Sequence, residues 1–192
     1  MKEFTKLSLS DYLSELSSGQ PVPGGGSASA YVAALAMGLT QMVGRITLNR
    51  KKKKDLTPEE NKKDDERREM IQKIVDSLEK AKTDAFQIVD IDPKVYQEVM
   101  DAWKDPAKSE EALKNSFRLQ ADLAMLIAMA KEATVSLADL CSGSVKNDLL
   151  VSAAMLEAAF RGAYHTAMIN VVYMKDEKEK KHSETALSEV KR

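Results

Sequence analysis

Cysteine and histidine are nearly absent from this sequence of 192 residues, which contains one cysteine, Cys141, and two histidines. A single cysteine cannot form a disulfide within the chain, so we expect Cys141 to pack as a small apolar group. Zinc sites draw several ligands from cysteine and histidine. The sequence offers no such cluster and predicts no metal site.

An excess of charge of either sign is also absent, because 29 basic residues stand against 30 acidic ones. No overall field attracts the chain to nucleic acid, and the basic run from Arg50 to Lys54 has no aromatic residues on which bases could stack. The segment from Met1 to Ser10 lacks the apolar run of a secretory signal. We expect no nucleic-acid binding and predict a cytoplasmic protein.

Aromatic residues make up only 5% of the sequence although 43% of it is hydrophobic, so alanine, leucine, valine, isoleucine and methionine must build the core. Such small side chains let helices approach one another closely. Apolar residues recur at the helical spacing i, i+3, i+4, and no stretch alternates with the period of a strand. The sequence predicts an all-α fold, a single-domain antiparallel helical bundle with long central helices rich in small residues.

Capping residues and prolines mark the expected helix ends. Ser8 is predicted to begin a short helix that ends near Leu16, and Thr57-Pro58 to begin a long one. Asp92-Pro93 repeats the pattern, so Asp92 is expected to begin the next helix. Further helices are expected over residues 27–49, from Asp105-Pro106 or Ser109 to about Leu140, and over residues 146–174. Residues 1–175 are predicted to form the helical domain, and residues 176–192 a charged C-terminal tail that is either a solvated helix or frayed.

The stretch from Ser27 to Gly44 carries no charge and is close to the length of a membrane span. It also contains polar residues and many alanines, which contribute little to the free energy of transfer into lipid. A central helix of a soluble bundle is apolar on all sides in the same way. We therefore expect this helix inside the bundle and predict no membrane association.

The segment Pro21-Val22-Pro23-Gly24-Gly25-Gly26-Ser27 precedes that helix directly. Prolines exclude helix before the glycines, and glycines allow positive φ or the close approach of another group. Ser27 is expected to be the N-cap. The first N–H groups of a helix lack internal partners and favour an anionic or carbonyl oxygen, so the loop is a candidate ligand site. A tight turn for close helix packing is the alternative.

Two later blocks accompany this loop. Residues 92–102 read Asp-Pro-Lys-Val-Tyr-Gln-Glu-Val-Met-Asp-Ala, and a third block runs from Asn147-Asp148 to Asn170. In this order, the three blocks resemble the formiminotetrahydrofolate cyclodeaminase family, which includes methenyltetrahydrofolate cyclohydrolases. The resemblance implies a homodimeric enzyme that acts on a reduced folate and needs no metal or other cofactor.

The resemblance leaves the reaction open. A cyclodeaminase closes 5-formiminotetrahydrofolate to 5,10-methenyltetrahydrofolate with loss of ammonia, whereas a cyclohydrolase opens the methenyl ring with water. Both need a group that moves protons and a site that holds the reacting nitrogens. We expect the cyclodeaminase reaction, with the cyclohydrolase as the first alternative. A non-catalytic folate-binding or helical interaction protein is the second.

The resemblance assigns proton transfer to Asp92, at the acidic position of the second block. The residues alone favour a helix cap for Asp92. Asp148 is the second catalytic candidate, predicted to bind the pterin or to orient Asp92, and it too could be a cap. His165 is a weaker candidate, because a lone histidine on an apolar helix is more often packed than catalytic.

The predicted substrate-binding residues come from the loop, the basic run and the third block. They are Pro23, Gly24, Gly25, Gly26, Ser27, Thr47, Arg50, Lys51, Lys52, Lys53 and Asn170. The basic run is expected to hold the glutamate tail of the folate, with one or several glutamates, by charge. A solvated loop is the alternative. Thr166 stands where the resembling family has asparagine, which puts the hydrogen bonds to the substrate in question.

Overall fold

The structure is a computed structural model that describes residues 2–53 and 55–190. Lys54 of the predicted basic run and Lys191 and Arg192 of the predicted tail lie outside the described residues. The helical elements are η1 (Phe4–Lys6), α1 (Leu9–Leu16), α2 (Gly25–Asn49), α3 (Pro58–Ala102), α4 (Pro106–Leu140), α5 (Lys146–Tyr173) and α6 (Glu177–Val190). No strand occurs among the described residues, so the predicted all-α fold is confirmed.

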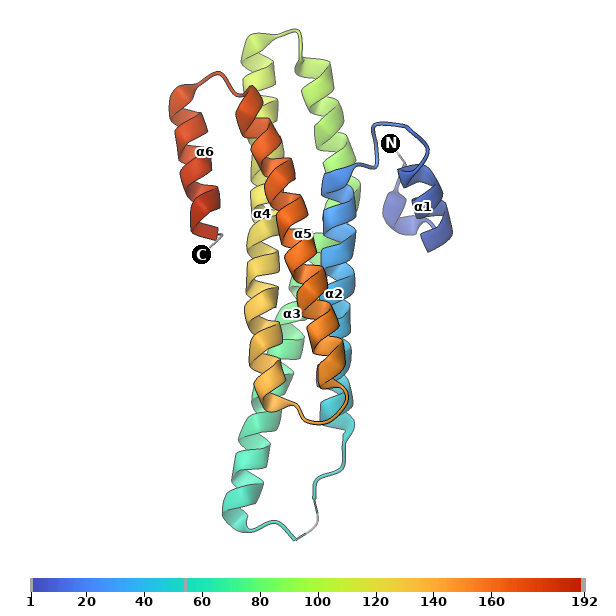
Figure 1. The fold of residues 1–192 in the computed structure, drawn as a ribbon, viewed down its shortest axis with the longest axis vertical. Helices are drawn as coiled ribbons and strands as arrows, with labels where there is room; N and C mark the ends of the chain where they lie inside the picture. The colour runs from blue at the N-terminus through green and yellow to red at the C-terminus, as the bar shows by residue number, and fades with distance from the viewer. Residues whose placement is uncertain (1, 54, 191–192) are drawn as a thin grey trace.

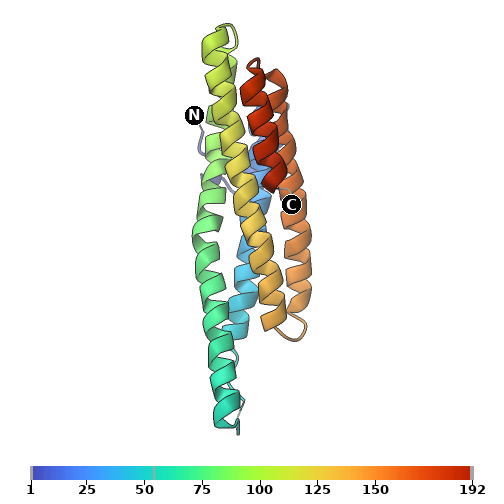
Figure 2. The same cartoon turned by 90° about the vertical axis from the view of Figure 1, so that its left-hand side faces the viewer.

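Helices α2 to α5 form an elongated antiparallel bundle, with α1 and α6 on its outside (Figures 1 and 2). The pairs α2·α3, α3·α4, α4·α5 and α5·α2 all pack together, which closes a ring of four helices around one core. Alanines of α2, including Ala30, Ala33 and Ala36, are fully buried. The absence of larger side chains lets the neighbouring helices approach α2 closely.

Helix α2 is also the one described helix long and apolar enough to cross a membrane, and 50% of its most apolar window is buried within the bundle. It packs against both α3 and α5. The helix therefore has the position expected for a central bundle helix.

Two predicted helix starts are confirmed. Ser8 caps α1 by accepting a hydrogen bond from the Asp11 backbone N–H. Thr57 and Glu60 form a capping box at the start of α3, each side chain bonding the other residue's backbone N–H. The proline at the first helical position of α3 needs no hydrogen bond there.

The predicted helix start at Asp92 is wrong, because α3 continues through Pro93 to Ala102. Proline has no N–H to donate to the carbonyl four residues earlier, which here belongs to Val89. The Ser27 hydroxyl of α2 donates to that carbonyl instead, at 2.9 Å. A hydrogen bond from a neighbouring helix thus compensates for the proline, and α3 does not end.

The prediction for Ser27 is wrong in a related way. Helix α2 begins at Gly25 with Gly24 as its N-cap, so Ser27 is already helical. Neither Gly25 nor Gly26 has the positive φ that the glycine run suggested; among described glycines only Gly19 and Gly143 do. The glycines at the start of α2 must therefore be explained by side chains that approach the backbone of α2 closely.

The segment after α5 turns back along the bundle as α6, whose surface is largely charged. One side of it is buried, since Leu187 is inaccessible and packs with Met174 and Val171 in a cluster at the end of the bundle. The Glu110 carboxylate of α4 accepts a hydrogen bond from the Lys175 N–H before α6 begins. These contacts hold α6 against α4 and α5.

Candidate active site

Helix α2 begins below one end of the bundle, while α3, α4 and α5 continue beyond its first residue (Figure 1). Asp92 of α3 lies beside Ser27, and α3 extends about 15 Å further at the helical rise of 1.5 Å per residue. The N-terminus of α2 therefore stops short of the ends of these three helices. Its positive dipole end favours an anionic group there.

The Asp92 carboxylate occupies this position. Its Oδ2 accepts a hydrogen bond from the Ser27 backbone N–H at 2.9 Å, and its Oδ1 accepts one from Gln120 Nε2 of α4 at 2.7 Å. Asp92 thus caps α2, although it belongs to α3. The capping role that its sequence context suggested is realised on a neighbouring helix.

Burial raises the pKa of the Asp92 carboxyl group from its ordinary value, and the hydrogen bonds from Ser27 and Gln120 act in the opposite direction. A raised pKa makes a carboxylate a stronger base, which favours the uptake of a proton from a reacting nitrogen. Asp92 is also only half-buried. These properties suit an acid–base group, which is the role predicted for it.

Gly26 makes room for the pair formed by Asp92 and Gln120. A Cβ on Gly26 would lie 2.2 Å from Asp92 Oδ1 and 2.3 Å from Gln120 Nε2, both impossible contacts. A Cβ on Gly25 would lie 3.6 Å from Thr166 Oγ1, which is an ordinary contact. The second glycine of the helix, not the run as a whole, is the one that the Asp92–Gln120 pair requires.

Helix α1 supports the start of α2 through Tyr12, whose ring stacks on Tyr31 of α2 with centroids 4.8 Å apart. The Tyr12 hydroxyl lies 3.2 Å from Ser27 Oγ, which in turn donates to the Val89 carbonyl. Tyr12 is buried, and burial raises the pKa of its phenol. This chain of contacts ties α1, α2 and α3 together directly behind the Asp92 carboxylate.

A cleft of about 360 Å³ begins one turn of α3 beyond Asp92, at Tyr96, and does not include Asp92 itself. Tyr96 follows Asp92 by one turn of α3, and Asn170 follows Thr166 by one turn of α5, so both extend the site from the Asp92 level into the cleft. Its walls are mostly apolar and aromatic, formed by Tyr96, Val99, Met100, Trp103, Leu113, Ser116, Ile169, Asn170 and Tyr173. The rings of Trp103 and Tyr173 meet edge to face at 5.4 Å. The volume lies within the range of about 300–1,000 Å³ typical of small-molecule sites.

The structure brings one group of predicted residues together at this end. The loop residues Gly24, Gly25, Gly26 and Ser27 lie around the start of α2, after a buried Pro23. Asn170 lines the cleft and donates its Nδ2 hydrogen to the Thr166 carbonyl at 2.8 Å; its Oδ1 accepts no hydrogen bond from any residue that the structure describes. His165 does not join the group, because it is exposed in a separate groove with Lys131 and Arg161.

The remaining predicted residues lie at the other end of the bundle. Thr47 is about 30 Å from Ser27 along α2 by helical rise, and Asp148 lies at the start of α5, about 27 Å before Thr166. Asp148 therefore does not contact Asp92 within one chain, and its predicted role stays a prediction. The third sequence block runs along most of α5, so its start lies far from its end.

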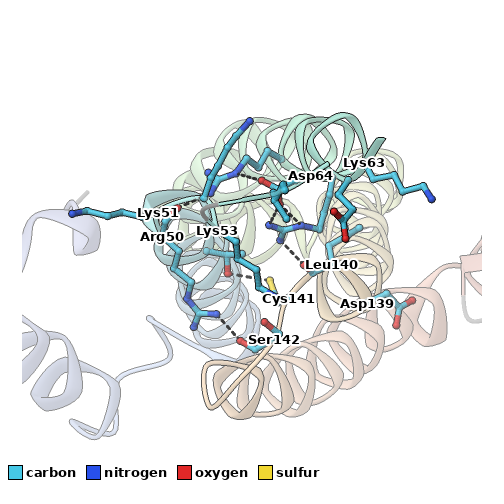
Figure 3. Close-up of a pocket in the computed structure, with 15 residues that line it drawn as sticks. Arg50, Lys51, Lys53, Lys63, Asp64, Asp139, Leu140, Cys141 and Ser142 are labelled. Carbon is cyan, nitrogen blue, oxygen red and sulfur yellow. Dashed lines mark hydrogen bonds and ion pairs between the residues drawn. The ribbon is translucent and has the colours of Figure 1, made fainter. Parts of the chain in front are cut away.

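The basic run forms a pocket of about 640 Å³ at this lower end, between the end of α2, the start of α3 and the end of α4 (Figure 3). Arg50 donates to the Ser142 carbonyl at 2.7 Å, and Arg67 and Arg68 donate to the carbonyls of Leu140 and Leu48 at 3.0 and 2.7 Å. The guanidinium groups thus satisfy backbone oxygens near the ends of α2 and α4.

The lysines of this pocket differ in their contacts. Lys52 pairs with Asp65, whereas Lys51 and Lys53 form no ion pair with any residue that the structure describes. Thr47 lines the pocket, but its hydroxyl is buried and donates to the Val43 carbonyl. Lys51 and Lys53 are therefore the cations that remain available to an anionic ligand.

Sequence reasoning missed Gln120, Tyr12 and the aromatic walls of the cleft. Gln120 is fully buried on α4, one turn from the buried Phe117 and Leu123. A polar amide inside an apolar stripe was the signal available in the sequence, since a buried amide needs specific partners. No cluster of His, Cys, Asp and Glu that could hold a metal ion occurs among the residues described.

Comparisons with known proteins agree with this geometry. The chain is 28% identical over 188 residues to the formimidoyltransferase-cyclodeaminase of Mus musculus, covering 91% of this chain and 33% of that protein. The corresponding protein of Gallus gallus is 29% identical over 167 residues, with 81% of this chain and 29% of that protein covered. The chain thus spans about a third of the length of these curated relatives.

A solved structure shares the whole fold. The crystal structure of formiminotetrahydrofolate cyclodeaminase from Thermotoga maritima matches with a TM-score of 0.85 and 25% identity, covering 98% of this chain and 90% of that one. The sequence model of formiminotransferase-cyclodeaminase matches residues 8–189, which includes most of α6. The chain therefore belongs to the formiminotransferase-cyclodeaminase family.

Proposed function

We propose that this protein is a folate-dependent one-carbon enzyme that cyclises 5-formiminotetrahydrofolate to 5,10-methenyltetrahydrofolate and releases ammonia. The observation that carries the proposal is the position of Asp92, a half-buried carboxylate held by the N-terminus of α2 and by Gln120 near an aromatic cleft. The names of the relatives and of the matching structure supply the class of substrate.

The reaction needs one proton carrier and no metal. The N5-formimino group reacts in its protonated, amidinium form. N10 attacks the formimino carbon, which gives a tetrahedral adduct with a positive charge on N10. The Asp92 carboxylate takes the N10 proton and passes it to the amino group, which leaves as ammonia while the N5 lone pair forms the new C=N bond. Asp92 ends as a carboxylate, and the positive charge ends on the methenyl group. A nearby carboxylate stabilises the cationic species on this path.

The cleft suits the flat rings of a reduced folate. Tyr96, Trp103 and Tyr173 supply aromatic surface, and Asn170 and Ser116 supply polar atoms among apolar walls. A few polar groups in an apolar cleft orient a ligand without a large desolvation cost. We place the pterin in the cleft with its N5 and N10 toward Asp92, which lies one turn of α3 from the cleft residue Tyr96.

One experiment tests the proposal and its alternatives. Purified protein is incubated with 5-formiminotetrahydrofolate and, separately, with 5,10-methenyltetrahydrofolate, while methenyl absorbance and free ammonia are recorded. We expect absorbance and ammonia to rise together with the first substrate. Loss of methenyl absorbance with the second substrate alone would identify a cyclohydrolase. Folate binding without either reaction would identify a non-catalytic protein.

We further propose that the unpaired lysines of the lower pocket bind the glutamate tail of long-chain folates. The pocket lies about 30 Å from the Asp92 level, so a single glutamate on a folate bound in the cleft cannot reach it within one chain. A polyglutamate tail, or a folate bound to a second copy of the chain, can. Affinity for polyglutamyl folate should then depend on this pocket, and affinity for monoglutamyl folate should not.

The tail prediction is tested by replacing Lys51, Lys52 and Lys53 with Gln. Each exposed cation contributes only about 0.2–1 kcal/mol, so the triple variant is needed. Polyglutamyl substrate should lose its advantage in KM and its salt dependence, because the screened electrostatic attraction is gone. A control with Lys73, Lys80 and Lys180 replaced by Gln removes the same charge elsewhere. If the two triple variants behave alike, these lysines are only a solvated surface.

We also propose that the chain forms a homodimer through the groove between α2 and α3. This groove of about 540 Å³ is almost wholly apolar and is lined by Tyr31, Ala34, Leu35, Gly38, Leu39, Met42, Lys82, Thr83 and Phe86. Leu35 is 49% exposed and Met42 39% exposed, which is unfavourable for a monomer. At the border of the groove, Lys82 and Arg45 both form ion pairs with Glu79. In a dimer with a twofold axis, these basic and acidic side chains of one copy can also pair with those of the other copy.

The dimer prediction is tested with Leu35→Glu, which introduces a charge into the apolar groove without removing a buried side chain. Sedimentation equilibrium should show a dimer for the wild type and a monomer for the variant, with helical content unchanged. The control is Leu150→Glu on α5, at a side chain that is 71% exposed outside this groove. If the dimers of Leu35→Glu and Leu150→Glu dissociate to the same extent, the interface does not lie in the groove between α2 and α3.

A further inference from the structure

Gln120 is the residue whose hydrogen bonding at the site is incomplete. Its Nε2 donates to Asp92 Oδ1 at 2.7 Å, but its Oε1 has no hydrogen-bond partner among the described residues, although the side chain is fully buried. A buried carbonyl oxygen without a donor is uncommon in folded proteins. The proton cycle of Asp92 offers a reason for it.

The two donors that hold Asp92 differ in freedom. The Ser27 N–H is part of the first turn of α2 and can only donate, so Asp92 Oδ2 remains an acceptor in every state. The Gln120 amide can turn by 180° about its terminal bond and present either a donor or an acceptor. A carboxylate requires the donor at Oδ1, and a carboxylic acid with its proton on Oδ1 requires the acceptor.

We propose that Gln120 is a positioning residue that keeps Asp92 hydrogen-bonded in both protonation states by turning its amide. With Asp92 ionised, Nε2 donates to Oδ1, as observed. After Asp92 has taken the N10 proton, the Oδ1 hydroxyl donates to Gln120 Oε1 until the proton passes to the leaving amino group. This inference rests on the proposed function for the role of Asp92 as proton carrier.

The surroundings of Asp92 make Gln120 the adjustable partner. The groups of α1 and α2 that border Asp92 are the Tyr12 phenol, Gly26 and the Ser27 N–H, and none of them is charged at neutral pH. Gly26 leaves no side chain between Asp92 and Gln120. Among the described residues, the Gln120 amide is therefore the one group hydrogen-bonded to Oδ1 that can exchange donor for acceptor without moving a helix.

A double-mutant cycle in urea tests the turning of the amide without any substrate. In Asp92→Asn, the asparagine side chain imitates protonated Asp92, because it has one acceptor and one donor. The asparagine oxygen can accept from the Ser27 N–H only if the asparagine NH₂ faces Gln120. If the amide turns, Gln120 Oε1 accepts from that NH₂. Asp92→Asn should then fold stably, and adding Gln120→Met should destabilise it about as much as Gln120→Met destabilises the wild type.

The opposite result is equally clear. If the amide cannot turn, Asp92→Asn opposes two donors in either orientation of the asparagine. Its NH₂ faces the Gln120 NH₂ when its oxygen accepts from the Ser27 N–H, and it faces the Ser27 N–H when its oxygen accepts from Gln120. The single variant would then lose stability, and Gln120→Met would restore it. A restoring effect of Gln120→Met in the Asp92→Asn background overturns the proposal, whether or not the protein turns over folate.

Kinetics separate positioning from packing. Gln120→Met keeps a long unbranched side chain but cannot hydrogen-bond Asp92, so we expect kcat to fall about 10-fold with KM within about twofold. The matched control is Gln41→Met, also a fully buried glutamine but bonded to the Val75 carbonyl and Glu79, far from Asp92. It should lower stability and leave both constants unchanged. Unchanged kcat in Gln120→Met would overturn the positioning role.

Discussion

Replacing Asp92 by Asn should lower kcat by about 10²- to 10⁴-fold and change KM little, because loss of a general acid–base group costs about that much. Asparagine has nearly the same volume and can still accept a hydrogen bond from the Ser27 N–H at the start of α2. It cannot take up the N10 proton. Turnover of 5-formiminotetrahydrofolate, followed by methenyl absorbance, measures the effect.

The pH profile provides a second measurement for the same group. Asp92 acts first as a base, so kcat/KM should fall as pH decreases through its pKa. Since burial raises that pKa, the fall should begin above the ordinary aspartate value of about 3.9. The Asp92→Asn variant should lack this acid limb in whatever activity it retains.

A matched control distinguishes the chemistry from loss of charge. Asp101 lies on the same helix, is exposed, and accepts a hydrogen bond from Gln97. Asp101→Asn removes an identical charge and should keep wild-type kcat. Activity of Asp92→Asn within about threefold of the wild type would mean that another group carries the proton.

The sequence predicted the fold class correctly because its evidence was local and repeated many times. Apolar residues at helical spacing and the cap at Thr57 concern neighbours in the chain, and the structure has both. The start predicted at Asp92 failed for a non-local reason. The hydroxyl of Ser27 reaches the Val89 carbonyl that Pro93 leaves free, and no pattern within residues 89–93 contains that information.

The composition of the site was predictable in part. The loop and Asp92 come from different sequence blocks, and the family resemblance placed them in one site; the structure places them in contact. Thr47 and Asp148 were grouped with them although the lengths of the predicted helices already implied separation by most of a bundle length. Gln120 required knowledge of which helix faces Asp92, which depends on how α3 and α4 pack.

Gly26→Ala should produce the second large effect, because a single methyl group cannot fit beside the Asp92–Gln120 pair. The added Cβ would stand 2.2 Å from Asp92 Oδ1, so the carboxylate or the start of α2 must move. Overpacking of this kind costs about 1–3 kcal/mol of stability. A displacement of about 1 Å in a catalytic group can also cost about 100-fold in rate, so we expect kcat to fall by about that factor.

Gly44→Ala separates the two consequences of the added methyl group. Gly44 is on the same helix, and its Cβ would lie 2.5 Å from Val75 Cγ2, an equally severe contact far from Asp92. Urea unfolding should show that both variants lose stability, while only Gly26→Ala loses kcat. If Gly26→Ala instead kept wild-type kcat, the position of Asp92 against the start of α2 would be irrelevant to catalysis, and proton transfer would have to be assigned to a group that Gly26 does not contact.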